Sequence, residues 1–152
     1  MTDIVIRPAV ADDVPAIVAM LAEDSMGVGR ESPDDLEPYL AAYERLRDDP
    51  HQYVMVAERA GTVVATLQLT IVPGLSRRGS TRSIIEAVRV HKPERGRGLG
   101  QRFVEWAIEE SRKQGCRLVQ LTSDASRTDA HRFYERLGFT GSHVGFKLPL
   151  GP

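Results

Sequence analysis

Residues 95–100, with the sequence RGRGLG, are the part of this 152-residue chain whose composition is best suited to binding a ligand. Glycines permit a tight turn and let backbone N–H groups approach an anion closely. The following residues read as the start of a helix, where free N–H groups and the helix dipole favour phosphate. Arg95 and Arg97 add positive charge. The pattern predicts a pyrophosphate-binding turn, and the alternative is a glycine-rich turn with solvated arginines.

The spacing of these glycines excludes two common nucleotide-binding motifs. The dinucleotide motif GxGxxG needs a third glycine where this chain has Gln101 or Phe103. The P-loop motif GxxxxGK[ST] also needs a glycine at position 101. The formal net charge of the chain is −1. We therefore expect no nucleic-acid binding, and only a local anion site.

The same stretch resembles the acetyl-CoA signature Q/R-x-x-G-x-G/A of the GCN5-related N-acetyltransferases (GNAT), at Arg95, Gly98 and Gly100. Residues 84–90 (IIEAVRV) look like the central strand of that family, and residues 133–139 (FYERLGF) look like its C-terminal signature. The expected order of elements agrees over nearly the whole chain. The resemblance implies an acyltransferase that uses acetyl-CoA and transfers acetyl directly to a primary amine of a small molecule.

The implied reaction needs a base, because an alkyl amine with a pKa of about 10 is mostly protonated at neutral pH. Our candidate is Glu86, which lies two residues before Val88 and is expected on the same face of the strand. A carboxylate in an apolar strand is costly unless it is paired or functional, so an ion pair with an arginine is the alternative. Tyr134 aligns with the family tyrosine near the CoA sulfur and is the candidate acid. Its alternative role is packing beside Phe133 and Leu137 on a buried helix face.

The resemblance also implies a set of donor-binding residues. The Val88 N–H is expected to stabilise the oxyanion, and its neighbours to hydrogen-bond the pantetheine arm. Many relatives carry an asparagine seven residues before the tyrosine, where this chain has Arg127, whose guanidinium can still donate to a carbonyl or phosphate. The residues predicted to bind acetyl-CoA are Val88, Arg89, Val90, Arg95, Gly96, Arg97, Gly98, Leu99, Gly100, Gln101 and Arg127.

The sequence constrains the identity of the acceptor less than that of the donor. Residues 126–150 look like one subgroup, the bacterial aminoalkylphosphonate N-acetyltransferases, so an anionic amine such as an aminoalkylphosphonate or an amino acid is expected. Arg77, Arg78 and Arg82 could bind such an acceptor bidentately, or form a solvated basic loop. Two other functions stay open: a protein lysine or N-terminal acetyltransferase, and a non-catalytic acyl-CoA-binding sensor.

No metal site is predicted. His131 and His143 could meet near the active site, and some of that subgroup are metal-dependent, but the sequence has no HExxH-type pair. We expect each histidine to be a surface or hydrogen-bonded residue. The single cysteine, Cys116, excludes an internal disulfide framework and is expected to pack as a small buried hydrophobe.

The hydrophobic pattern predicts the elements that position these residues. We expect strands near 4–6, 53–57, 63–72, 83–90, 118–122 and 144–150, and helices near 14–23, 33–49, 99–114 and 129–137. This order predicts one α/β (α+β) domain over residues 1–152, with the GNAT fold implied by the resemblance. Its mixed, mostly antiparallel sheet should have six to seven strands flanked by about four helices, and residues 83–122 should place two parallel strands in the middle.

The composition, with 41% hydrophobic and 27% charged residues, is that of an ordinary globular domain. We expect no membrane association, because no apolar run approaches spanning length and no signal-peptide core is found. With one cysteine, a cytoplasmic location is expected. The run VGFKLPL at 144–150 could join a homodimer, or be an edge strand that only bounds the sheet.

Overall fold

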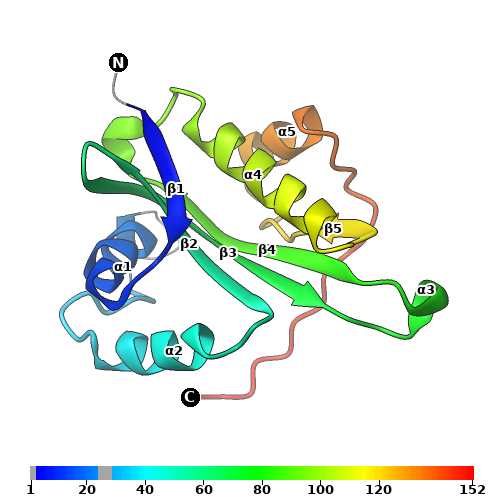
Figure 1. Cartoon of the computed structure of the whole chain (residues 1–152), viewed down its shortest axis with the longest axis horizontal. Coiled ribbons are helices and arrows are strands. Elements are labelled where there is room, and N and C mark those ends of the chain that lie inside the picture. The colour runs from blue at the N-terminus through cyan, green and yellow to red at the C-terminus, as the bar shows by residue number, and fades with distance from the viewer. Residues whose placement is uncertain (1–2, 24–28) are drawn as a thin grey trace. The chain divides into compact units, whose positions relative to one another are not determined.

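The computed structural model describes residues 3–23 and 29–152. The chain forms two compact units, Met1–Gln120 and Leu121–Pro152. The first unit holds the sheet, and the second holds one helix and the C-terminal segment (Figure 1).

The first unit is built on one five-stranded sheet in the order β1-β2-β3-β4-β5. All neighbours are antiparallel except β4 and β5, which run parallel. Helix α4 (Leu99–Lys113) connects these two strands, as the predicted strand–helix–strand unit requires. The strands are β1 (Ile4–Pro8), β2 (Gln52–Arg59), β3 (Thr62–Val72), β4 (Arg82–Val90) and β5 (Leu118–Gln120).

Helices cover both faces of this sheet. On one face Val56 of β2 packs in a buried cluster with Val18 of α1 (Val14–Glu23) and Tyr43 of α2 (Glu37–Arg47). On the other face the buried Ser83 hydroxyl of β4 lies 2.7 Å from the Ser111 hydroxyl of α4. Val56 pairs with Thr66 of β3, and Ser83 pairs with Ile71 of β3. Because Thr66 and Ile71 are an odd number of residues apart, the side chains of Val56 and Ser83 point to opposite faces of the sheet. Glu86 also belongs to the face covered by α1 and α2, because it opposes Gln68 of β3.

Helix α4 is fixed to the sheet by an apolar stripe. Leu99, Phe103, Val104 and Ala107 occupy positions i, i+4, i+5 and i+8 on one face of the helix and are at most 3% exposed. Burial of each large side chain contributes about 1.5–3 kcal/mol. Because Leu99 is the first residue of α4, this packing also fixes the end of the glycine-rich loop that precedes it.

An ion pair ties β1 to the turn before α1. The Arg7 guanidinium donates to both carboxylate oxygens of Asp13, at 2.7 and 3.0 Å, and also to Glu58 at 3.2 Å. Asp13 additionally accepts the backbone N–H of Val10 at 2.8 Å. The Arg7 hydrogen bonds and the Val10 N–H therefore lower the pKa of Asp13 below its ordinary value.

We expect Asp13→Asn to destabilise the protein by about 1–3 kcal/mol at neutral pH, because it weakens a partly buried ion pair. The pKa of Asp13 is lower in the folded chain, so its stabilisation is fully present above the unfolded value of 3.8 and is lost as pH falls through the folded value. The difference from wild type in urea unfolding should therefore shrink below about pH 4. The exposed neighbour Asp12, changed to Asn, is the control. A difference that is constant between pH 3 and pH 7 would contradict the role of the charge.

The second unit contains α5 (Thr128–Arg136) and an extended segment. The Tyr134 ring packs edge-on against Phe133 and Phe139, with centroid distances of 5.1 and 5.8 Å. The predicted strand at 144–150 is not formed, because none of the described ladders includes it. Its alternating apolar side chains are instead exposed: Val144 78%, Phe146 92%, Leu148 83% and Leu150 92%.

The fold class is confirmed, with differences in detail. The described sheet has five strands rather than six to seven, since the C-terminal strand is missing. The second helix begins at Glu37 rather than near position 33, after a turn in which the Asp35 N–H donates to the Ser32 carbonyl. Its Pro38 suits the first helical turn. The loop between β3 and β4 contains an extra short helix, α3 (Ser76–Gly79). Within residues 3–23 and 29–152, every helix is too short or too polar to span a lipid bilayer.

Candidate active site

The central strand β4 carries a β-bulge at its middle. Gln68 and Thr66, two residues apart on β3, pair with Glu86 and Arg89, three residues apart on β4. Ala87 takes up the extra residue with a φ of 55°, in the left-handed region that costs a side chain energy. Such bulges bend a strand and redirect its side chains.

The bulge changes which side chains lie together. Thr66 and Gln68 share a face of β3, so their partners Arg89 and Glu86 share a face of β4. The expectation that Glu86 and Val88 lie on one face is therefore wrong, because the extra residue reverses the alternation between them. The side chain that accompanies the Glu86 carboxylate is instead the partly buried Arg89.

Glu86 itself is exposed, and within the part of the chain that the structure describes its carboxylate makes no hydrogen bond or ion pair. The alternative of a structural pair with an arginine is thus not realised among these residues. Exposure also removes the desolvation cost that the apolar strand suggested. A solvated carboxylate beside a strained residue on the central strand is free to accept a proton from a bound amine, directly or through water.

Beyond the bulge, β4 is open on one side. Its parallel ladder with β5 covers only Arg82 to Ile84, so the described structure gives the rest of this edge no strand partner. The Val88 carbonyl accepts from Arg89 Nη1 at 2.9 Å, and the Val90 carbonyl accepts from Arg95 Nε at 3.0 Å. An extended ligand can hydrogen-bond such an open edge as an added strand would.

The glycine-rich loop has room for an anion. Gly96 and Gly98 have φ values of 81° and 79°, and a Cβ added at either would meet nothing within 4 Å. Gly98 is the N-cap of α4, and it has no side chain to cap the N–H groups of the first turn. Gly100 and Gln101 belong to that turn, and the Gln101 amide is turned away towards Glu105 at 2.9 Å. The unfilled space over these donors fits a pyrophosphate bound by backbone groups.

The loop arginines are paired within the protein. Besides its bond to Val90, Arg95 lies 3.8 Å from a carboxylate oxygen of Glu23. Arg97 lies 3.6 Å from Glu94, which also accepts from Arg59 Nε at 3.2 Å. The sequence indicated a local excess of positive charge, and the structure places carboxylates against it.

The remaining candidates lie in the second unit. Tyr134 is partly buried on α5, and Arg127 is exposed at the N-cap of this helix, where its N–H donates to the Asp124 carbonyl at 3.0 Å. His131 Nε2 lies 2.8 Å from the same carbonyl oxygen, and His143 Nδ1 lies 2.6 Å from the Ser142 hydroxyl. The described residues include no group of three that could hold a metal ion.

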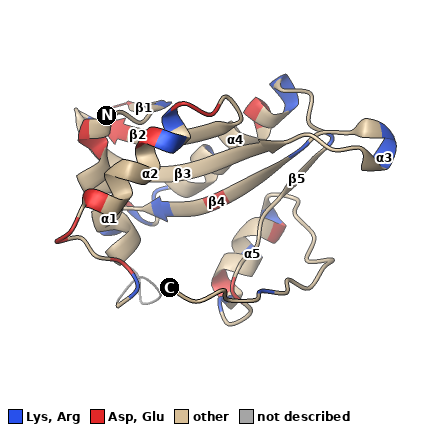
Figure 2. Cartoon of the chain, turned by 90° about the horizontal axis from the view of Figure 1, so that it is seen from below, with Lys and Arg blue, Asp and Glu red and all other residues tan. Residues whose placement is uncertain are grey.

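Arg77, Arg78 and Arg82 lie at the other end of β4 from the glycine-rich loop. The first two have left-handed φ values of 54° and 63° and form the basic tip of the β3–β4 hairpin, at α3 in Figure 2. Arg82 precedes Glu86 by four residues, about 13 Å along a strand. This separation does not favour them as ligands for the charged group of a small amine whose nitrogen lies at Glu86.

Cys116 lies just before β5 and is partly rather than fully buried. Burial raises the pKa of its thiol, which opposes formation of the nucleophilic thiolate. A role as a covalent acetyl carrier is therefore not favoured.

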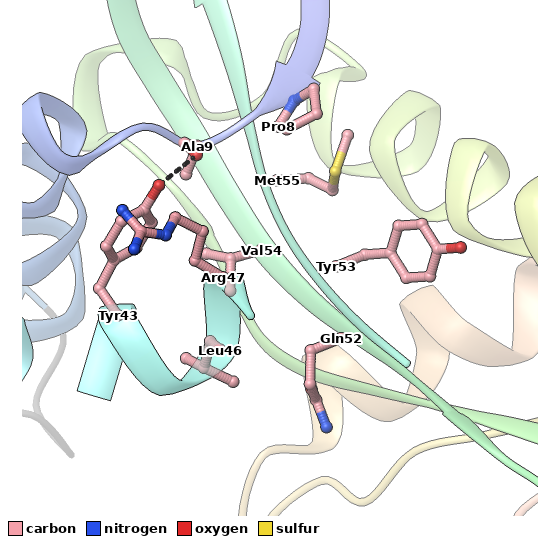
Figure 3. Close-up of a pocket in the computed structure, with 9 residues that line it drawn as sticks. All are labelled: Pro8, Ala9, Tyr43, Leu46, Arg47, Gln52, Tyr53, Val54 and Met55. Atoms are coloured by element: carbon pink, nitrogen blue, oxygen red, sulfur yellow. Dashed lines mark hydrogen bonds between the residues drawn. The ribbon is translucent and has the colours of Figure 1, made fainter. Parts of the chain in front are cut away.

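A pocket of about 210 Å³ lies at the opposite edge of the sheet, where β1 and β2 meet α2. In Figure 3 the Tyr43 hydroxyl donates to the Ala9 carbonyl at its wall, at 3.0 Å. The lining includes Arg47, whose guanidinium is paired with Glu44 at 2.6 Å. Because β3 separates this edge from β4, the pocket is not part of the Glu86 site.

Sequence reasoning did not find Ala87, Glu23 and Glu94 as parts of this site. No glycine marks the bulge, so position 87 carried no signal for a left-handed residue. Glu94 lies next to the signature and could have been read as a partner for Arg97 at the (i, i+3) spacing. Glu23 ends a helix far away in sequence, and nothing in its surroundings indicated the contact.

Comparison with known proteins identifies the family that the sequence motifs resemble, and the match extends along most of the chain. The model of the acetyltransferase (GNAT) family matches residues 16–139. An aminoalkylphosphonate N-acetyltransferase of Salmonella typhimurium is 30% identical over 145 residues, which cover 95% of this chain and 90% of that protein. The similarity is thus not confined to the C-terminal third.

Solved structures agree with this match. A crystal structure described as a transcriptional regulator from Bacillus halodurans C-125 has a TM-score of 0.93 and 41% identity, covering 97% of this chain and 100% of that one. An acetyltransferase from Trypanosoma brucei has a TM-score of 0.76 and 27% identity, covering 97% and 100% of the two chains. The chain therefore belongs to the acetyltransferase (GNAT) family and is an acyltransferase.

Proposed function

We propose that this protein transfers acetyl from acetyl-CoA directly to the primary amine of a small anionic molecule, such as an aminoalkylphosphonate or an amino acid. The observation that carries the proposal is the arrangement on β4, where Glu86, whose carboxylate has no partner among the described residues, precedes a left-handed bulge and the glycine-rich loop follows the same strand. Glu86 removes the proton of the amine, and the Val88 N–H stabilises the oxyanion. The backbone of residues 96–101 holds the pyrophosphate.

An anionic acceptor is supported by two features. The guanidinium-bearing Arg89 shares a strand face with Glu86 and supplies positive charge beside the base. The Salmonella relative, 30% identical over 95% of this chain, is described as an aminoalkylphosphonate N-acetyltransferase. The arginines of the hairpin tip are not needed for this assignment.

A thiol-release assay with acetyl-CoA tests the proposal. The acceptor panel contains 2-aminoethylphosphonate, amino acids, the matched neutral amine ethanolamine, and lysine-containing peptides. We expect turnover with the anionic amines and at least tenfold lower kcat/KM with the neutral one, as the loss of one charge-assisted contact implies. Turnover only with peptides would favour a protein acetyltransferase, and binding of acetyl-CoA without turnover would favour a sensor. Either result would overturn the proposal.

Tyr134 is proposed as the acid that protonates the departing thiolate. We expect Tyr134→Phe to lower kcat by at least about tenfold, because a positioned acid contributes 10²-fold or more. The ring contacts to Phe133 and Phe139 are kept in this variant, so its far-UV circular dichroism spectrum should match that of the wild type. Full kcat in Tyr134→Phe would show that the tyrosine only packs.

Three expectations stay predictions: the contact of Arg127 with acetyl-CoA, the cytoplasmic location and the homodimer. The exposed apolar side chains at 144–150 support the last of these, since a second copy would cover them.

A further inference from the structure

Glu23, the last residue of α1, makes a contact with the donor loop that the proposed mechanism does not use. One of its carboxylate oxygens lies 2.5 Å from His91 Nδ1, and the other accepts the backbone N–H of Lys92 at 3.0 Å. The side chain is only 21% exposed. The Glu23 carboxylate thus ties α1 to the segment in which the chain leaves β4 and enters the loop.

The contact between Glu23 and the Lys92 N–H affects how the chain turns after β4. Residues Lys92–Glu94 form a 3-10 turn in which the Glu94 N–H donates to the His91 carbonyl at 2.8 Å. The first N–H groups of a turn have no partner within it, and none of the turn's own side chains caps this one. Glu23 satisfies the group from another element and so fixes the direction in which the turn leaves the strand.

A second carboxylate restrains the other side of the same turn. Glu94 is 13% exposed and accepts from Arg59 of β2 at 3.2 Å, with Arg97 at 3.6 Å. The turn is therefore tied to α1 at its start and to β2 at its end, two residues before Gly96. A binding loop that is already ordered loses less conformational entropy when its ligand binds.

We infer that Glu23 is a positioning residue for donor binding, which holds residues 92–95 so that the backbone N–H groups of the glycine-rich loop face the pyrophosphate. The inference rests on the proposed function. Glu23 does not bind the phosphate, because a carboxylate would repel it. It acts through His91, Lys92 and the Arg95 guanidinium 3.8 Å away, and its effect should fall on the affinity for CoA rather than on the chemical step.

Calorimetric titration with CoA tests this role. We expect Glu23→Ala to raise the Kd for CoA about five- to tenfold, while kcat at saturating acetyl-CoA stays within about twofold of wild type. Glu23→Gln keeps an oxygen that can accept the Lys92 N–H, so it should recover part of the affinity and keeps the test usable if the alanine variant folds poorly. Glu109→Ala removes a carboxylate that is 58% exposed on α4 and paired with Arg112, and should leave Kd unchanged.

The His91 contact is tested by a double-mutant cycle. His91→Ala should raise the Kd for CoA in the wild type and have no further effect in Glu23→Ala, because the His91–Glu23 contact is already lost there. Additive effects would overturn the link through His91. Wild-type affinity in Glu23→Ala would overturn the inference and leave the proposed function intact. Failure of the wild type to bind CoA would overturn the proposed function and the inference with it.

Discussion

Glu86→Gln should lower kcat/KM by about 10²- to 10³-fold at neutral pH, within the range that a general base contributes. The amide has nearly the same size as the carboxylate and no buried partner in the described structure to lose. Stability and the Kd for CoA should therefore not change. The acidic limb of the pH profile of kcat/KM should also disappear, because in the wild type this limb reports the protonation of the base in the free enzyme.

The pH profile distinguishes a base from a residue that only orients the amine. Loss of a hydrogen-bond acceptor alone would lower kcat/KM by a similar factor at every pH and leave the acidic limb in place. That outcome would contradict the base assignment. Glu109→Gln, a neutralisation at an exposed site of α4, is the control for the loss of one negative charge.

The sequence predicted most of the first unit because its elements carry strong local patterns. The stripe of α4, the hairpin of β2 and β3, and the crossover to β5 were all confirmed. The predicted strand at 144–150 also has a strong alternating pattern, but a strand needs a partner edge as well as a pattern. A hydrophobic pattern identifies a segment that can pair, and it does not supply the neighbour.

The details of the site were harder to predict, because they depend on register. Whether Glu86 accompanies Val88 or Arg89 is decided by one extra residue at Ala87, and a slip of one residue exchanges the faces of a strand. The donor loop was easier to predict, since its glycines can be recognised directly in the sequence. Its supports Glu23 and Arg59 come from elements distant in sequence, and only the folded chain brings them to the loop.

The largest effect on donor binding is expected from Gly98→Ala. Gly98 has a φ of 79°, and a Cβ at this position meets no protein atom within 4 Å. The substitution should therefore cost about 1–2 kcal/mol for the left-handed backbone and cause no clash inside the protein. The methyl group would, however, occupy the space over the N–H groups at the start of α4. We expect the KM for acetyl-CoA to rise about 10- to 100-fold, as a displacement of about 1 Å at a binding site can cause.

Gly115, at the other end of α4, provides a matched control. It has the same φ of 79°, and an added Cβ there also meets nothing within 4 Å. Gly115→Ala should therefore lose about the same stability in urea unfolding as Gly98→Ala while its KM for acetyl-CoA stays within about twofold of wild type. Because the two variants carry the same backbone strain, the ratio of their KM values isolates the effect of the methyl group on the ligand. Equal KM values would show that the pyrophosphate does not lie over Gly98.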